Sequence, residues 1–154
     1  MIGAISNPKK SLVVDFSIEQ LKSTIEFIPL LNEKYKFTSK NAILNAYTFE
    51  ALEFLSLGIY ADISLSKQNE ERTEITIEIR RKVGAFDQAF EVSKANDHIA
   101  KLFELISQCI VLSDEEIKNL TEKKTNSPEK KGCMLAVLLT VIGALGGSVL
   151  YAMS

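Results

Sequence analysis

The sequence is poor in the residues from which common catalytic and metal sites are built. It has one histidine, two cysteines and no tryptophan among 154 residues. A zinc site needs several imidazole or thiolate ligands at suitable spacing, which this chain does not offer. Its two cysteines, Cys109 and Cys133, do not provide the disulfide framework of a small secreted domain.

Motifs for nucleotide binding and for the common hydrolases are also absent. The sequence contains no GxGxxG, no P-loop, no HExxH and no GxSxG. These absences argue against a nucleotide-binding protein, a zinc protease and a serine hydrolase. We therefore expect no cofactor, no metal and no enzymatic activity, although an unfamiliar enzyme stays open.

The charge balance argues against a nucleic-acid partner. The chain has 18 Lys and Arg against 20 Asp and Glu, and four of its lysines lie in residues 121–132. The preceding part is therefore mildly acidic, whereas a nucleic-acid-binding domain needs a basic face.

The last apolar run of the sequence predicts a membrane helix. Residues 133–152 (CMLAVLLTVIGALGGSVLYA) contain no charged residue. As a helix they would span about 30 Å, the thickness of the hydrocarbon core of a bilayer. The N-terminus lacks the apolar run of a secretory signal, and cytoplasmic flanks are enriched in lysine. We therefore expect a single-pass, tail-anchored protein with a cytoplasmic N-terminal domain and these membrane-flanking charges: Lys123, Lys124, Lys130 and Lys131.

Small residues within this run suggest self-association. Gly143 and Gly147 are four residues apart, a spacing at which two membrane helices can approach closely. The spacing is compatible with a homodimer through the membrane helix, although it is also common in membrane helices that do not pair. We expect a basic, flexible linker at residues 121–132 to join this helix to the folded domain.

The first part of the chain has strand and helix patterns in turn. Residues 10–16 (KSLVVDF) predict a strand, and Ser17 with Gln20 has the spacing of a capping box that opens a helix ending near Pro29. Residues 41–49 fit a strand or a short helix, and we favour a strand. Residues 59–66 and 75–80 alternate between apolar and polar side chains, which predicts an antiparallel hairpin.

A long amphipathic helix follows from Ser93. Its apolar residues recur at three and four, which predicts one stripe packed on the sheet. We expect Cys109 to be buried on this stripe, His98 to face solvent, and these residues to pack together: Ile77, Ile79, Ile99, Leu102 and Ile106. A second capping-box spacing, Ser113 with Glu116, predicts a short helix after it.

Together these patterns predict an α+β fold over residues 1–120, an antiparallel sheet of about four strands with two helices packed on one face. The stretches SLVVDFSIEQLKSTI, LGIYADISL, TEITIEIRRKVG and ANDHIAKLFELIS carry a resemblance to small, mostly uncharacterised bacterial domains of β-α-β-β-β-α order. The resemblance is one of pattern and implies no activity.

Two functional interpretations follow. The first is a non-enzymatic binding or interaction module at the membrane surface, with the bilayer and an unknown protein as partners and Arg80, Arg81 and Lys82 as an anionic-partner patch. The alternative is a small lipid- or hydrophobic-ligand-binding domain with a cavity between the sheet and the closing helix. A cavity of several hundred Å³ favours the alternative, whereas a filled core with an exposed apolar patch favours a partner.

Overall fold

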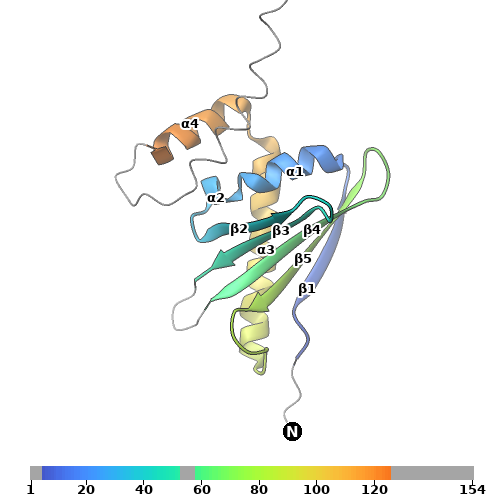
Figure 1. The fold of residues 1–154 in the computed structure, drawn as a ribbon, viewed down its shortest axis with the longest axis vertical. Coiled ribbons are helices and arrows are strands. Elements are labelled where there is room, and N and C mark those ends of the chain that lie inside the picture. Colours follow the sequence, from blue (N-terminus) through green and yellow to red (C-terminus); the bar gives the residue numbers. More distant parts are fainter. Residues whose placement is uncertain (1–4, 53–57, 126–154) are drawn as a thin grey trace, which may run out of the picture. The chain divides into compact units, whose positions relative to one another are not determined.

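The computed structural model describes residues 5–52 and 58–125, which contain one five-stranded antiparallel sheet and four helices (Figure 1). The strands lie in the order β1-β5-β4-β3-β2, so the first strand pairs with the last. The elements along the chain are β1 (Lys9–Val14), α1 (Ile18–Glu26), α2 (Ile28–Leu31), β2 (Tyr35–Asn41), β3 (Ala46–Ala51), β4 (Ile59–Lys67), β5 (Thr73–Arg81), α3 (Ala89–Val111) and α4 (Asp114–Thr125).

The sequence predicts a sheet of about four strands, whereas the sheet has five. Residues 41–49 are not one strand, because the chain turns between the end of β2 and the start of β3. The Asn41 side-chain oxygen accepts hydrogen bonds from the main-chain N–H groups of Ile43 and Leu44, each at 3.1 Å. Asn45 then adopts a positive φ of 48°. Two asparagines thus make the turn. Its tip residues are apolar, so this stretch of sequence lacks the run of polar residues and glycines that usually indicates a turn.

The hairpin and the helix caps are confirmed. β4 and β5 pair in register, with Ile63 opposite Ile77, and buried side chains alternate with less buried ones along both strands. Ser17 caps α1 in a reciprocal capping box with Gln20. The predicted short helix after Ser113 is α4, which continues to Thr125 and so enters the segment predicted as a linker.

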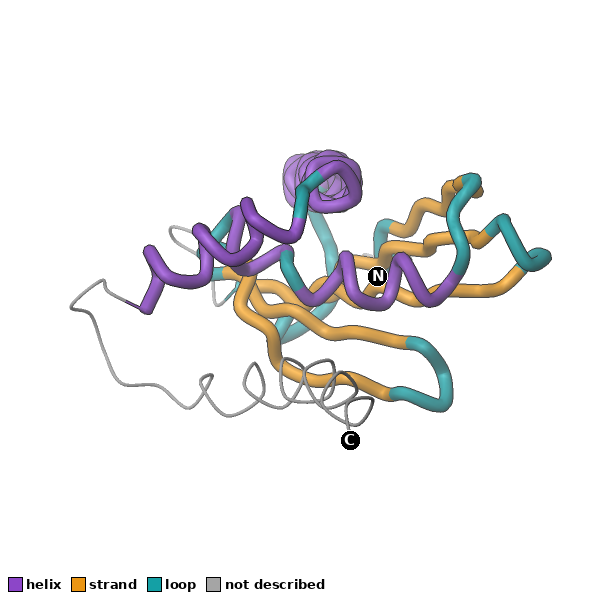
Figure 2. The backbone as a smooth tube through the Cα atoms, turned by 90° about the horizontal axis from the view of Figure 1, so that it is seen from above, coloured by secondary structure: helices purple, strands orange, loops and turns teal. Residues whose placement is uncertain are grey.

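The helices α1, α2 and α3 cover one face of the curved sheet (Figure 2). Their apolar side chains pack against the apolar side chains of that face. The predicted group of core residues is confirmed, since each is at most 2% exposed: Ile77, Ile79, Ile99, Leu102 and Ile106. The opposite, outer face of the sheet carries the polar residues of the same strands. We call the helix-covered side the inner face.

The predicted membrane anchor is not supported. Across residues 5–52 and 58–125, the structure has no helix that is both long and apolar enough to cross a bilayer. The 23-residue α3 has the length but carries a charged side along with its buried one. The predicted segment 133–152 lies outside the described residues, as do Lys130, Lys131, Gly143 and Gly147. The interpretation as a tail-anchored, single-pass cytoplasmic module therefore lacks support, and what the structure shows is an α+β domain.

The inner face gives a first prediction. Leu102→Ala should lower the free energy of unfolding by about 2–5 kcal/mol, because it removes a fully buried leucine between α3 and the sheet. Lys101→Ala, on the adjacent charged side of α3, should change it by less than about 0.5 kcal/mol. Denaturant unfolding followed by circular dichroism measures both. Equal, small effects would mean that α3 does not present this face to the sheet.

Candidate functional site

The inner face is apolar except for a few buried polar side chains. Two of them, Thr24 and Thr73, donate hydrogen bonds to the main-chain carbonyls of Gln20 at 2.8 Å and Phe16 at 2.9 Å. These bonds satisfy the hydroxyls locally, as buried polar groups require. The remaining buried polar atoms belong to Tyr35, Tyr47 and His98, and they lie among the side chains of the core.

Tyr35 and His98 join the sheet to α3. The Tyr35 hydroxyl lies 2.8 Å from His98 Nδ1, and the two rings meet edge to face with centroids 5.7 Å apart. Either group can donate, depending on the imidazole tautomer. His98 is only 4% exposed, so the prediction of a solvent-facing histidine is wrong. The signal was available, since position 98 lies three residues after Ala95 and four before Leu102, which are both buried.

Tyr47 on β3 is the exception to local pairing. Its side chain is 1% exposed, and its hydroxyl has no hydrogen-bond partner among the residues that the structure describes. An unsatisfied buried hydroxyl costs about 1–3 kcal/mol. Burial, assisted by the carboxylates of Glu26 and Glu19, raises the pKa of Tyr47 to about 12. The hydroxyl is therefore protonated at neutral pH and available as a donor.

A β-bulge places a lysine over this tyrosine. The register between β2 and β3 shifts between Phe37 and Ser39, so Lys40 lies opposite Tyr47 and shares its face. The Lys40 ammonium lies 5.5 Å from the centre of the Tyr47 ring and 2.6 Å from a carboxylate oxygen of Glu26 on α1. The ion pair thus closes the space between α1 and the sheet beside Tyr47.

The two polar positions are separate. Tyr35 lies opposite Ala51, four residues along β3 from Tyr47. At about 3.3 Å per residue, the two backbone positions are about 13 Å apart. Phe37 and Phe49 lie between them and contact each other edge to face, with centroids 5.6 Å apart. The inner face therefore offers an aromatic middle with one polar group toward each end.

The outer face carries charged and aromatic residues of the sheet. Arg80 pairs with Asp62, and Lys82 lies 2.7 Å from a carboxylate oxygen of Glu50. Tyr60 lies between these cations, 5.3 Å from the Arg80 guanidinium and 5.4 Å from the Lys82 ammonium. Each cation therefore has a carboxylate partner.

Arg81 lies on the opposite face from its two neighbours in sequence. Its guanidinium is 3.1 Å from Glu91 in the first turn of α3 and donates to the carbonyl of Ala85 at 3.0 Å. Alternation along β5 separates the three cations predicted as one patch. Recognition of an anionic partner by Arg80, Arg81 and Lys82 stays a prediction.

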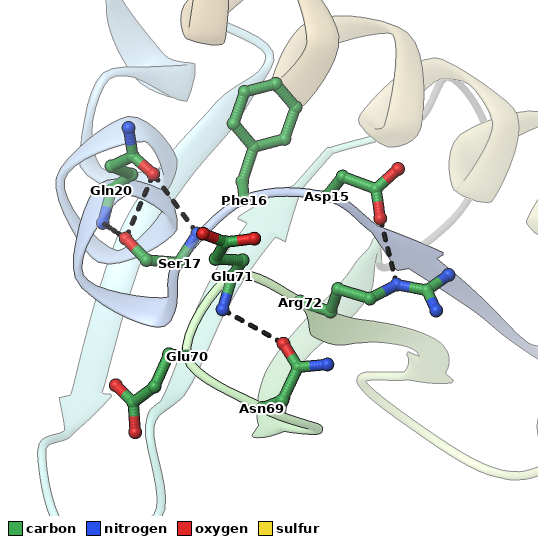
Figure 3. A pocket seen from close by; sticks show the side chains of 8 residues that line it. All are labelled: Asp15, Phe16, Ser17, Gln20, Asn69, Glu70, Glu71 and Arg72. Atoms are coloured by element: carbon green, nitrogen blue, oxygen red, sulfur yellow. Dashed lines mark hydrogen bonds and ion pairs between the residues drawn. The ribbon is translucent and has the colours of Figure 1, made fainter.

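A hollow of about 340 Å³ lies where β1 leads into α1, beside the turn between β4 and β5 (Figure 3). Its lining is mostly polar: Asp15, Phe16, Ser17, Gln20, Asn69, Glu70, Glu71 and Arg72. Asp15 pairs with Arg72 at 2.9 Å. Within residues 5–52 and 58–125 no group of three or more metal-ligating side chains could hold a metal ion. This hollow differs from the predicted apolar cavity in both lining and position.

Three further predicted residues have known positions. Cys109 is buried as predicted, and burial raises the pKa of its thiol to about 11, so it is protonated and a poor nucleophile at neutral pH. Lys123 lies in the last turn of α4. Lys124 donates to the Pro29 carbonyl at 2.7 Å, a contact with α2 that sequence reasoning did not foresee.

No family model and no curated protein sequence matches the chain. An uncharacterized protein from Bacillus thuringiensis has a similar structure, with a TM-score of 0.53, 9% identity, and coverage of 70% of this chain and 100% of that chain. CalU16 from Micromonospora echinospora gives a TM-score of 0.49 at 10% identity, over 74% of this chain and 81% of that chain. A START superfamily protein from Mycobacterium smegmatis gives a TM-score of 0.36 at 11% identity, over 74% and 98%. The first likeness shows the fold alone, and it confirms the resemblance to small uncharacterised bacterial α+β domains.

The buried pair gives a second prediction. Tyr35→Phe should lower the free energy of unfolding by about 1–3 kcal/mol, because His98 loses a hydrogen bond inside an apolar layer. Tyr60→Phe is the matched control and should change it by less than about 0.5 kcal/mol, since phenylalanine keeps the ring on the outer face. Denaturant unfolding measures both variants. Equal effects would show that the Tyr35 bond does not hold α3 to the sheet.

Proposed function

We propose that this domain binds a small, mostly apolar molecule between the sheet and α3. The observation that carries the proposal is the Tyr35–His98 hydrogen bond, a polar pair set among apolar side chains where the closing helix meets the sheet. Ligand sites in proteins are mostly apolar and use a few placed polar groups to orient the ligand. Tyr35 and His98 can each donate or accept, so the pair suits a ligand oxygen.

Binding is favoured over catalysis by the chemistry of these groups. Nucleophilic catalysis needs an activated side chain beside a base, and the buried Cys109 thiol is protonated. The inner face is closely packed by its core residues, and a filled core taken alone favours a protein partner over a ligand. A ligand would therefore enter by separating α3 from the sheet, as in a pocket that opens only in a minor conformation.

A second candidate, docking onto a protein partner, is favoured by the tip of the turn between β2 and β3. Ile43 is 91% exposed and Leu44 is 66% exposed, side by side at this tip. Apolar residues gathered at an exposed position are typical of interaction sites. Tyr35 lies at the opposite end of the β2–β3 pair from this tip, so variants at Tyr35 and at the tip separate the two candidates.

The third prediction uses the only histidine of the chain as a reporter. Selective ¹³C and ¹⁵N labelling of histidine gives one imidazole signal, that of His98. Titration of the full chain with 2-acetylnaphthalene, a neutral aromatic ketone, should shift this signal saturably. Tyr35→Phe should raise Kd about fivefold, the loss expected for one hydrogen bond of about 1 kcal/mol.

The control for this titration is the double variant Ile43→Ser/Leu44→Ser, which should bind the ketone with unchanged Kd. An imidazole signal that does not move at saturating ketone would contradict ligand binding between the sheet and α3. A shift that disappears in the double variant would instead assign the apolar contact to the turn and favour the second candidate.

A further inference from the structure

We propose that the Tyr47 hydroxyl forms a second polar anchor on the inner face, which donates a hydrogen bond to an uncharged oxygen, such as a ketone, ester or amide carbonyl, at one end of an apolar ligand. This inference rests on the proposed ligand-binding function and names the chemistry of the ligand. It follows from three observations on β2, β3 and α1.

The first observation is the missing partner. Tyr47 is 1% exposed and its hydroxyl makes no hydrogen bond, whereas the buried threonines on the same side, Thr24 and Thr73, are both satisfied. A buried polar group without a partner requires an explanation. Packing does not supply one, because phenylalanine would fill nearly the same volume without the hydroxyl.

The second observation is the ion pair of Lys40 and Glu26, which covers Tyr47. The bulge in β2 brings Lys40 above the Tyr47 ring, and Lys40 pairs with Glu26 of α1 at 2.6 Å. Both side chains of this pair are partly exposed, at 41% and 30%. Partly exposed ion pairs contribute little to stability, so this cover opens easily. It lies where a ligand could reach Tyr47 without unfolding the sheet.

The third observation concerns charge. Glu26 is paired with Lys40 and Glu19 is paired with Lys22, so the two carboxylates and the two lysines leave no net charge beside Tyr47. A ligand carboxylate at the buried hydroxyl would lose its water without gaining a counter-charge. The subsite therefore accepts an oxygen that is a hydrogen-bond acceptor without a full negative charge.

The position also sets the shape of the ligand. Tyr47 lies about 13 Å along β3 from the position opposite Tyr35. The aromatic pair Phe37 and Phe49 occupies the interval. A ligand that reaches both anchors is elongated, with an aromatic or aliphatic middle and an oxygen at each end.

The test compares three probes with the same ring system against the full chain. 2,6-Diacetylnaphthalene carries an uncharged acceptor at each end, 2-acetyl-6-ethylnaphthalene carries one at a single end, and 6-acetyl-2-naphthoate carries a negative charge in place of the second ketone. Affinities are measured from the His98 imidazole signal for the wild-type chain, for Tyr47→Phe and for Tyr60→Phe. The ketone preference, which is the affinity for the diketone relative to the monoketone, should fall at least fivefold in Tyr47→Phe and stay unchanged in Tyr60→Phe.

A further variant tests the charge argument. Glu26→Gln removes the carboxylate partner of Lys40 and leaves the ammonium as a counter-charge near Tyr47, so the naphthoate should bind several-fold more tightly while the affinity for the diketone is unaffected. In the absence of any probe, Tyr47→Phe should unfold at the same or a higher denaturant concentration than the wild-type chain, because it removes an unsatisfied hydroxyl.

The outcomes separate the two proposals. An unchanged ketone preference in Tyr47→Phe overturns this subsite while leaving binding at Tyr35 and His98 intact. A lower unfolding midpoint for probe-free Tyr47→Phe also overturns it, since the hydroxyl would then have a partner, such as a bound water, in the free protein. Failure of all three probes to move the His98 signal overturns the proposed function and this subsite with it.

Discussion

One constraint places the buried groups of this domain: the sheet has a single apolar face, and the helices must cover it. On β4 and β5 that face is set by strict alternation, with Ile63 opposite Ile77. A slip of one residue would turn every one of these side chains to the outer face. Because α1 and α3 cover the same face, polar groups that point inward meet helix side chains rather than bulk water. Such groups must find partners there or remain unsatisfied. The Tyr35 hydroxyl finds a partner in His98, whereas the Tyr47 hydroxyl has none among the described residues.

The bulge in β2 is the local departure from this alternation that matters most for the candidate site. Up to Phe37 the strand presents its apolar residues to the inner face, and regular pairing would send Lys40 outward. The shift at this point turns Lys40 inward, where its ammonium lies over the Tyr47 ring and pairs with Glu26. A bulge re-aims a side chain at the cost of a break in the ladder. Because of this bulge, Lys40 lies over the buried Tyr47 ring and pairs with Glu26, instead of pointing from the outer face into solvent.

Sequence reasoning reached the parts of this fold that depend on periodicity. The hairpin of β4 and β5, the apolar stripe of α3 and the cap at Ser17 follow from patterns within one segment. It missed the turn after β2, since Ile43 and Leu44 at the tip give no turn signal of their own. The prediction that His98 faces solvent is wrong because the buried side of α3 is wider than the predicted apolar stripe. It includes positions on both sides of Ile99. Neither the Tyr35 contact nor the bulge beside Lys40 could be derived, because both depend on pairing between segments.

The choice of side chain at two positions of β3 separates packing from recognition. Phe49 and Tyr47 are two residues apart, on the same strand and the same face, and both are fully enclosed. Phe49 fills its place in the apolar layer with a purely hydrocarbon side chain, which packs against Phe37. At Tyr47 the ring fills the same layer, but the added hydroxyl has no hydrogen-bond partner among the described residues, a situation that usually costs stability. A polar atom that the fold does not need, placed beside an ion pair that opens easily, is accounted for by a partner outside the fold, and an uncharged oxygen at the end of an apolar molecule has the chemistry to fill that role.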